Sequence, residues 1–467
     1  MQHVDVITLG AGGGAYPAAF RLARAGRRVV MVDPKGVMSG NCLAEGCVPS
    51  KAVREVAELY RTAQRFERFG LSGEIGADFA GVVAHKDRVQ RTRYTQHAAE
   101  LARLAERLTL VQGVARLQDA YTVVVESEHG EESYRAEHII IASGSDVFVP
   151  PIPGAELCVT SHDLYALDSS FKSLPRRLVV IGGGYIGLET ATFLRAFGAE
   201  VTVLEMMDQI LPGMDPDFVA GLAPLLDPAI RRVTGAKVET IENAADGTLT
   251  VRYAVGDKNE TGDKTETVAA DAVLMAAGRH AVVPEGAEAI GLELQRGRVV
   301  ADTALRTNLP GLYACGDVNG RVPLFHAAVG QSLIASRNIL GGDQALDYFD
   351  FGAVPTTIFT LPMAAYVGHT RAALKARGIE ALETAYNFAE DSRAQIFDET
   401  QGEIRLFFEP GTLRLLGGWI IGIDAGQLVG EIGLAVSKGL TAHDLAAFCD
   451  QHPMASEGIS KAARALF

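Results

Sequence analysis

The chain has 467 residues, of which 48% are hydrophobic and 21% charged, as in an ordinary globular protein. A chain of this length is too long to fold around a single hydrophobic core, so we expect two to four domains. A net charge of −14 argues against a nucleic-acid partner, because such proteins normally carry a clustered basic surface. No leader-like basic segment precedes the first apolar run, and no apolar run reaches membrane-spanning length, so a soluble cytoplasmic protein without a membrane contact is expected.

An internal repeat organises the chain. Residues 4–33 predict a strand, a glycine-rich turn, a helix and a second strand, and residues 177–205 repeat this order. The landmarks of the first copy are Gly10, Gly12, Ala15 and Asp33, and those of the second are Gly182, Gly184, Gly187 and Glu205. Every landmark of the second copy lies 172 positions after its counterpart, as Gly182 does after Gly10. Two βαβ units of one design are therefore predicted.

The residues of each unit suit a dinucleotide. Glycines let the backbone approach a pyrophosphate, and the following helix N-terminus offers N–H groups and positive potential. The acidic residue after the second strand can accept from a ribose hydroxyl. A tight turn without a ligand is the plain alternative for each copy taken alone. Two such units in one chain predict one tightly held and one exchanging electron carrier.

The segments between and after the repeats suggest the domain order. Apolar strands that end in Gly144 and in Gly278-Arg279 predict the crossings between the two nucleotide domains, and Gly316-Asp317 predicts a return to the first. An ordinary β-turn is an equal reading of Gly316-Asp317. We expect a first nucleotide domain at 1–147 and 273–345, a second at 148–272, and an α+β interface domain at 346–467.

A cysteine pair lies between the first unit and a long helical region. Four residues separate Cys42 from Cys47, and the second pair of a zinc site is missing, so no metal is expected. Lys51 follows one helical turn later, and a helix N-terminus and a cation both favour a thiolate. Dithiol–disulfide exchange is thus predicted, with two buried structural thiols as the alternative. The remaining cysteines are expected to be small buried apolar residues, namely Cys158, Cys315 and Cys449.

These motifs resemble one family, the class I pyridine nucleotide–disulfide oxidoreductases. The segment CLAEGCVPSK (42–51) is similar to their redox-disulfide signature, and GGGYIGLE (182–189) to their NAD-binding unit. Within the family the dihydrolipoamide dehydrogenases are most similar. The resemblance implies FAD on the first unit and NAD on the second, a homodimer, and a lipoylated carrier protein or 2-oxoacid dehydrogenase complex as partner. It also implies that Cys42 exchanges with substrate, that Cys47 faces the flavin, and that Lys51 pairs with Glu189.

The tail supports the same resemblance. His452-Pro-Met-Ala-Ser-Glu457 is similar to the segment that carries the family's catalytic base. His452 is expected at a helix N-cap, with Pro453 in the first helical position and Glu457 one turn inside. A carboxylate there would orient the imidazole and stabilise its protonated form.

Some positions depart from the family pattern. Asn41 precedes the first cysteine, Ala44 and Glu45 lie between the two, and residues 323–331 follow a different pattern. Mercuric reductase and high-molecular-weight thioredoxin reductase need a C-terminal cysteine pair, which is missing. A reductase of glutathione or CoA disulfide, and a non-catalytic FAD-bound scaffold, remain as alternatives.

Overall fold

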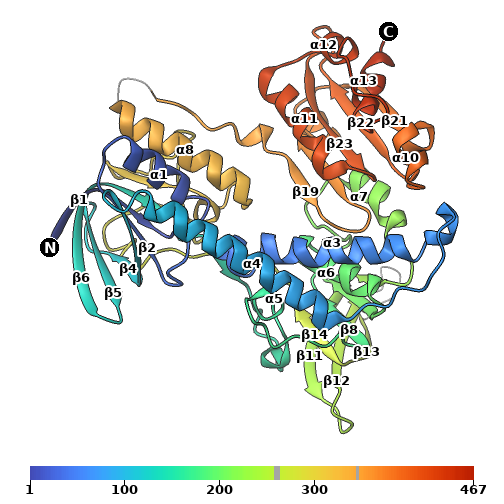
Figure 1. Cartoon of the computed structure of the whole chain (residues 1–467), viewed down its shortest axis with the longest axis horizontal. Helices are drawn as coiled ribbons and strands as arrows, with labels where there is room; N and C mark the ends of the chain where they lie inside the picture. Colours follow the sequence, from blue (N-terminus) through green and yellow to red (C-terminus); the bar gives the residue numbers. More distant parts are fainter. Residues whose placement is uncertain (257–262, 343–345) are drawn as a thin grey trace.

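The computed structural model describes residues 1–256, 263–342 and 346–467 (Figure 1). Its first unit is built on a seven-stranded sheet of order β3-β2-β1-β6-β5-β4, with β18 paired to β6. The strands are β1 (Gln2–Leu9), β2 (Val29–Asp33), β3 (Leu108–Gln112), β4 (Val114–Leu117), β5 (Thr122–Ser127), β6 (Gly130–Ile141) and β18 (Leu312–Ala314). The five strands β3, β2, β1, β6 and β18 run parallel. Successive residues of β1 point to opposite faces of the sheet: Val6 packs in one core and Ile7 in another. The sheet is therefore covered on both sides.

The helices of the first unit either pack on this sheet or carry the cysteine pair. They are α1 (Tyr16–Arg24), α2 (Gly40–Ala44), α3 (Cys47–Ala63), α4 (Phe79–Ala102) and α8 (Phe325–Gly341). The two cysteines lie on successive helices, because Cys42 is inside α2 and Cys47 is the first residue of α3. In Figure 1, α3 runs from the first unit toward the rest of the molecule. The cysteine segment therefore lies where the units meet.

The second unit repeats the design on a smaller scale. Its parallel sheet has the order β10-β9-β8-β14, with strands β8 (Arg177–Ile181), β9 (Glu200–Glu205), β10 (Arg231–Thr234) and β14 (Ala272–Met275). Helix α6 (Tyr185–Ala196) follows β8, and the antiparallel strands β11 (Ala236–Asn243), β12 (Leu249–Gly256) and β13 (Asp263–Ala270) complete the unit. Because β14 pairs with β8, the boundary expected at 273 falls inside a strand of this second sheet.

The C-terminal unit is an antiparallel sheet of order β19-β20-β23-β22-β21. Its elements are β19 (Thr356–Ile358), β20 (Ala364–Gly368), β21 (Leu382–Asn387), β22 (Glu403–Phe408), β23 (Leu415–Ile421), α11 (Ala425–Lys438), α12 (Ala442–Ala446) and α13 (Glu457–Arg464). Along β22, Leu406 packs with α11 and α13, whereas the next residue, Phe407, packs toward α3 and α7 (Pro216–Leu222). The predicted fold class is therefore confirmed: two dinucleotide-binding α/β units and a C-terminal α+β domain.

The expected burial of the three remaining cysteines can be compared with the structure. Cys315 is buried and Cys158 is half-buried, but Cys449 is exposed, so the prediction of a buried residue was wrong there. Cys449 follows α12 in an irregular segment, where no neighbouring element covers it. Among the helices of the described ranges, none is both long and apolar enough to cross a membrane.

The third glycine of the second repeat offers a test of the turn. A Cβ on Gly187 would lie 2.0 Å from the carbonyl oxygen of Gly182, whereas a Cβ on Gly184 would meet no atom within 4 Å. We expect Gly187→Ala to lower the free energy of unfolding by about 1–3 kcal/mol, as overpacking does. Gly184→Ala is the matched control and should unfold like the wild type in denaturant titrations. Equal midpoints for the two variants would contradict this account.

Candidate active site

The first glycine turn is held by the carboxylate of Asp33. Asp33 Oδ2 accepts from the amide of Ala11 at 3.1 Å, and Oδ1 accepts from the amide of Lys35 at 2.9 Å. Gly10 has a φ of +108°, and a Cβ there would lie 2.2 Å from the oxygen of Ala142, so only glycine fits. The carboxylate is thus fixed at the mouth of the turn, where a ribose hydroxyl could reach it.

The second turn reproduces these contacts at the same offset of 172 positions. Glu205 Oε2 accepts from the amide of Gly183 at 2.7 Å, and Oε1 accepts from the amide of Met207 at 2.8 Å. Gly182 also has a φ of +108°, and its Cβ would lie 2.3 Å from the oxygen of Ala276. The repeat therefore extends from residue types to individual hydrogen bonds.

Both turns have the donors that a pyrophosphate needs. Within the described residues, the amides of Gly12, Gly13 and Gly14 have no acceptor, and neither have those of Gly184 and Tyr185. No side chain caps α1 or α6 at its N-terminus. Free amides at a helix N-terminus attract anions. These residues fit FAD on the first turn and NAD on the second.

The predicted crossing residues converge beside the first turn. Ser145, which follows Gly144, donates from Oγ to Asp317 Oδ2 at 2.6 Å and accepts from Arg279 Nε at 2.9 Å. Its carbonyl oxygen accepts from Arg279 Nη2 at 2.7 Å and from Asn41 Nδ2 at 2.9 Å. Gly316 (φ +84°) and Gly278 (φ +120°) precede the two charged residues. The structure thus joins the ends of β6, β14 and β18, although the cofactor contacts of these residues stay predictions.

The two cysteines of the redox pair differ electrostatically. Both are free thiols, with Cys42 half-buried and Cys47 exposed. A hydrogen bond from the Cys42 thiol lowers the pKa of Cys47, and Lys51 lowers it further, while the same bond and burial raise the pKa of Cys42. Cys47 also has the amide end of α3 beside it. Of the two, Cys47 is therefore the one that ionises.

Lys51 lies between the cysteine helix and the second unit. Its ammonium donates to Glu189 Oε2 at 2.7 Å and lies 4.4 Å from the centre of the Phe359 ring. Glu189 Oε1 accepts from the amide of Phe359 at 3.0 Å. Glu189 is buried, so its charge requires these partners. The predicted Lys51–Glu189 pair is present, and its role in catalysis stays a prediction.

The unusual residue between the cysteines takes part in a second ionic cluster. Glu45 contacts the ammonium of Lys35, and its Oε1 lies 3.2 Å from Nε2 of His162. Lys35 also donates to Asn41 Oδ1 at 2.9 Å. Asn41 and Glu45, which depart from the family pattern, therefore hold α2 against the end of β2 and the start of α5 (Ser161–Tyr165).

His452 and Glu457 form the expected pair in a different local structure. His452 Nδ1 lies 2.9 Å from Glu457 Oε1, which also accepts from the amide of Met454 at 3.2 Å. Burial raises the pKa of Glu457, but the bonds from His452 and Met454 outweigh it, and the pKa is lowered. The N-cap prediction was wrong, because α13 begins at Glu457 with Ser456 as its N-cap. Pro453 instead precedes a turn in which the amide of Glu457 donates to the carbonyl of Met454 at 3.2 Å, so the helix begins four residues later than expected.

Within one chain, the C-terminal sheet separates this histidine from the cysteine pair. Val53 of α3 packs in one core with Phe407 and Trp419 on the near face of the sheet. Leu406 and Ile420, on the far face, pack in another core with Ile459 of α13. The imidazole of His452 is 70% exposed, so it faces outward. One chain thus carries the cysteines and the histidine on opposite sides of a sheet.

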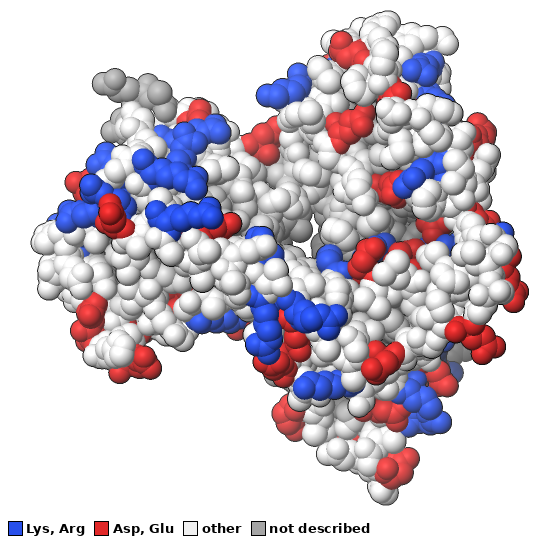
Figure 2. All heavy atoms as spheres, viewed as in Figure 1, with Lys and Arg blue, Asp and Glu red and all other residues white. Residues whose placement is uncertain are grey.

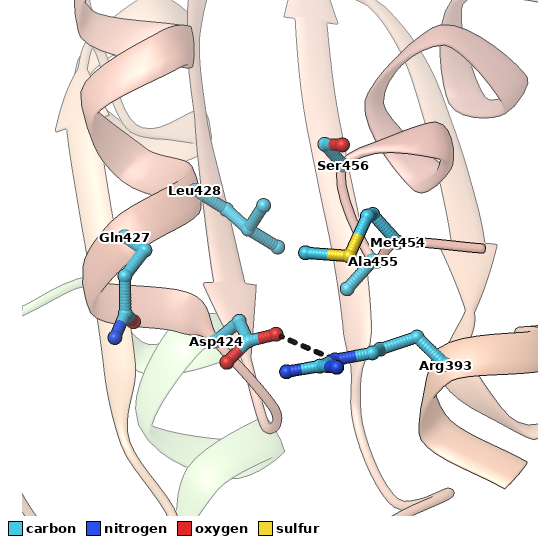
Figure 3. Close-up of a pocket in the computed structure, with 7 residues that line it drawn as sticks. All are labelled: Arg393, Asp424, Gln427, Leu428, Met454, Ala455 and Ser456. Atoms are coloured by element: carbon cyan, nitrogen blue, oxygen red, sulfur yellow. Dashed lines mark hydrogen bonds and ion pairs between the residues drawn. The ribbon is translucent and has the colours of Figure 1, made fainter. Parts of the chain in front are cut away.

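A cavity of about 280 Å³ lies next to the histidine segment (Figure 3). Its lining residues are Arg393, Asp424, Gln427, Leu428, Met454, Ala455 and Ser456. Figure 3 shows Met454 reaching toward Leu428, and Arg393 pairing with Asp424, at 3.4 Å between Nε and Oδ2. The cavity belongs to the far face of the C-terminal sheet and not to the cysteine site. Among the residues that the structure describes, no group of three His, Cys, Asp or Glu side chains could hold a metal ion.

Three residues that contact the candidate site were not predicted from the sequence. Ser145 directly follows a predicted glycine and could have been found by its position. Phe359 contacts Glu189 from 170 residues away, and no local signal marks it. His97, on α4, contacts Ser39 Oγ at 3.5 Å and the Tyr16 ring, and a lone histidine on a long helix gives no hint of this place.

The fold and site define a class of protein: a chain with two glycine turns suited to dinucleotides and a thiol pair beside the first. Comparison with known families agrees. The chain belongs to the pyridine nucleotide-disulphide oxidoreductases, whose family model matches residues 4–332. The dimerisation domain of the same family matches residues 354–463. The protein is thus an FAD- and NAD(P)-dependent disulfide oxidoreductase with a dimerisation domain.

Similar proteins of known name extend over the whole chain. A dihydrolipoyl dehydrogenase of Haemophilus influenzae is 34% identical, with 98% of this chain and 94% of that protein covered. A dihydrolipoyl dehydrogenase of Bacillus subtilis is also 34% identical, with 99% and 96% covered. A solved Cu(II) complex of RclA, an HOCl-induced flavoprotein disulfide reductase from Escherichia coli, is 25% identical with a TM-score of 0.86, and both chains are fully covered. LpdA from Mycobacterium tuberculosis, 23% identical with a TM-score of 0.88 and full coverage of both chains, shares the fold.

The electrostatic role of Lys51 can be tested by a pH titration. Lys51 lowers the pKa of Cys47, so Lys51→Met should raise it, and the thiolate should form only at higher pH. The measurement is the long-wavelength absorbance of partially reduced, FAD-loaded protein as a function of pH. Lys375→Met, at an exposed position on α9 (Arg371–Ala376), is the control and should leave the midpoint unchanged. A midpoint that does not move in Lys51→Met would refute the assignment.

The choice of nicotinamide cofactor follows from Glu205. A carboxylate repels a 2′-phosphate by about 4 kcal/mol at roughly 4 Å and an effective dielectric near 20, before screening. No lysine or arginine occurs between Glu205 and Arg231 to offset it. We expect NADH to be preferred over NADPH by up to about three decades in kcat/KM. Glu205→Ser should narrow the preference, and equal values in the wild type would contradict this reading.

Proposed function

We propose that the protein is a dihydrolipoyl dehydrogenase, which oxidises a protein-bound dihydrolipoyl dithiol and passes the electrons to NAD⁺. The observation that carries the proposal is the asymmetric pair Cys42 and Cys47, with Lys51 lowering the pKa of the second thiol. The full-length similarity to two proteins named dihydrolipoyl dehydrogenase supports it. Glu205 favours NAD as the final acceptor.

The chemistry starts from the oxidised Cys42–Cys47 disulfide. His452 takes the proton of one substrate thiol, and the resulting thiolate attacks the sulfur of Cys42. The Cys42–Cys47 bond breaks, and Cys47 leaves as a thiolate, which Lys51 and the α3 N-terminus stabilise. The second substrate thiol then attacks the first substrate sulfur, and Cys42 leaves with the proton of that thiol. The substrate has lost two electrons and two protons, of which one proton stays on His452.

Glu457 assists this step by holding the imidazole. Its hydrogen bond to Nδ1 leaves Nε2 free to accept the substrate proton, and its charge stabilises the imidazolium that forms. FAD, held at the first turn by the Gly12–Gly14 amides and Asp33, would carry the electron pair between the cysteines and NAD. Lys51, paired with Glu189, would place positive charge beside the negative charge that accumulates on the reduced centre.

We place the histidine of each site on the second subunit of a homodimer. Because the C-terminal sheet separates His452 from Cys42 within one chain, the same chain is a poor source for both. The exposed imidazole and the dimerisation domain favour a shared site. A two-fold dimer then has two equivalent sites, each built from both chains.

A second candidate is an NADH-dependent reductase of another disulfide, such as that of glutathione or CoA. It is favoured by the ionic cluster of Glu45, which departs from the family pattern beside Cys42. A non-catalytic FAD-bound scaffold is less well supported, because all six residues expected for turnover are present, namely Cys42, Cys47, Lys51, Glu189, His452 and Glu457.

The test is a comparison of substrates on the purified, FAD-loaded dimer. Dihydrolipoamide and a reduced lipoylated carrier domain are assayed with NAD⁺, and glutathione disulfide and CoA disulfide with NADH. The proposal expects the largest kcat/KM for the lipoyl substrates, and none with Cys42→Ser. Faster turnover of another disulfide would replace it with the reductase, and no turnover of any substrate would favour the scaffold.

The shared site predicts complementation between two inactive variants. Loss of a general base typically costs about 10² to 10⁴ in rate, so Cys42→Ser and His452→Ala dimers should both be nearly inactive. Statistical refolding of an equimolar mixture makes about half of the dimers mixed, each with one intact site, so about a quarter of all sites should recover. The measurement is activity after refolding, with the mixed dimers confirmed by differential tags. If tagged mixed dimers form and activity does not return, both residues act within one subunit.

A further inference from the structure

An arginine-rich region covers α1 and α4, despite the net charge of −14. Residues 16–28 and 88–107 contain nine arginines, two glutamates and no aspartate or lysine. Figure 2 shows Lys and Arg side chains gathered over this part of the molecule. The net charge of the chain therefore conceals a local positive surface.

Six of these arginines lack an acidic partner. Arg27, Arg28 and Arg91 approach Glu137, Asp5 and Asp168 within 4.0 Å. In contrast, six exposed arginines have no carboxylate within that distance among the described residues: Arg88, which contacts His85, and Arg21, Arg24, Arg93, Arg103 and Arg107. We call the last five of these residues the arginine surface. Unpaired guanidinium groups are available to carboxylates of a partner.

The arginine surface is continuous because α1 and the end of α4 share one core. Phe20 of α1 packs with Leu101 and with Leu104, just after α4. Arg24 lies 5.9 Å from the centre of the Phe20 ring. The carbonyl of Arg107 accepts from the amide of Val29, directly after the α1 turn. The arginines of the two segments therefore lie on adjoining parts of one face.

One end of this surface reaches the cysteine helix. Arg93 Nη2 lies 2.8 Å from His97 Nε2, and His97 Nδ1 lies 3.5 Å from Ser39 Oγ. Ser39 precedes α2, and its amide donates to Ala11 of the first glycine turn at 2.9 Å. Cys42 lies three residues further along. The Tyr16 ring packs beside His97, with centroids 6.2 Å apart, and burial, followed by the nearby Cys42, raises the pKa of Tyr16.

We propose that the arginine surface docks an acidic carrier domain and so brings the dithiol on its flexible arm close to Cys42. This inference rests on the proposed function, and it specifies the partner: a protein domain with a carboxylate-rich face. A carboxylate face is favoured over a nucleic acid because the charge of −14 on the whole chain repels an extended polyanion, whereas a compact domain contacts only the local surface. Guanidinium groups also bind carboxylates in bidentate geometry.

The test compares a small neutral substrate with a carrier-bound one. In the FAD-loaded dimer, Arg21→Glu, Arg24→Glu and Arg103→Glu are combined, because all three are exposed and outside the catalytic machinery. The control combines Lys172→Glu, Arg176→Glu and Lys237→Glu, which make the same charge change at exposed positions of the second unit. Dihydrolipoamide and an acidic dihydrolipoyl carrier domain are assayed with NAD⁺ at low and physiological ionic strength.

The surface variant should raise KM for the carrier by about tenfold or more at low salt, with a smaller effect at physiological salt. Turnover of dihydrolipoamide, which needs no docking, should stay unchanged, and the control should resemble the wild type with both substrates. Unchanged carrier KM in a variant that still turns over dihydrolipoamide overturns the proposal. If the reversed variant does not fold, the same three positions as glutamine should give a smaller rise in KM, and no rise refutes the surface.

Failure of the proposed function gives a different pattern. If the wild type turns over neither lipoyl substrate, the proposed function fails, and binding of the carrier domain is measured directly by fluorescence anisotropy. Binding that the reversal abolishes and the control retains still supports the docking surface, whereas no binding by the wild type overturns it. Binding of a labelled DNA duplex at physiological salt, lost in the reversed variant, would reassign the surface to nucleic acid.

Discussion

The carboxylate of Glu189 is a buried charge at which side chain or backbone of all three units meet. It is buried on α6 of the second unit, and it binds the ammonium of Lys51 on α3 and the amide of Phe359 at the start of the C-terminal unit. A buried charge is stable only while such partners satisfy it, so loss of Lys51 would leave the carboxylate without its counter-charge. Because α3 begins at Cys47, the same contact orients the redox pair toward the rest of the site.

The two nucleotide turns solve one physical problem in the same way. In each, a carboxylate after the second strand accepts from the amide at the beginning of the turn and from the amide two residues after itself. These bonds stabilise a turn that leaves further amides free for an anion. The units differ in their surroundings: the first adjoins the cysteine helices, and the second adjoins the C-terminal sheet through Glu189 and Phe359. The two turns therefore differ in the elements that surround them and not in their hydrogen bonds.

The C-terminal sheet divides the chemistry of one chain. Alternation along β22 and β23 sends every second side chain to α3 and α7, and the others to α11 and α13. The near face thus supports the cysteine pair, while the far face presents His452, held by Glu457. The dimerisation domain is therefore also the part of the chain that carries the proposed base, so association and catalysis depend on the same element.

Local sequence is sufficient to predict the two βαβ units, the cysteine pair at the beginning of a helix and the acidic residue after each second strand. These features depend on backbone preferences and short-range hydrogen bonds, which residues a few positions apart encode. Contacts between distant segments became visible only in the tertiary structure. They are the hydrogen bond from Phe359 to Glu189, the contact of His97 with Ser39, and the exposed arginines on α1 and α4. The position of His452 relative to α13 was also not predictable from local sequence. Proline often occupies the first position of a helix, but here it precedes a separate turn, and α13 begins only at Glu457. Such contacts depend on which elements pack together, and a charge total or a single motif does not contain that information.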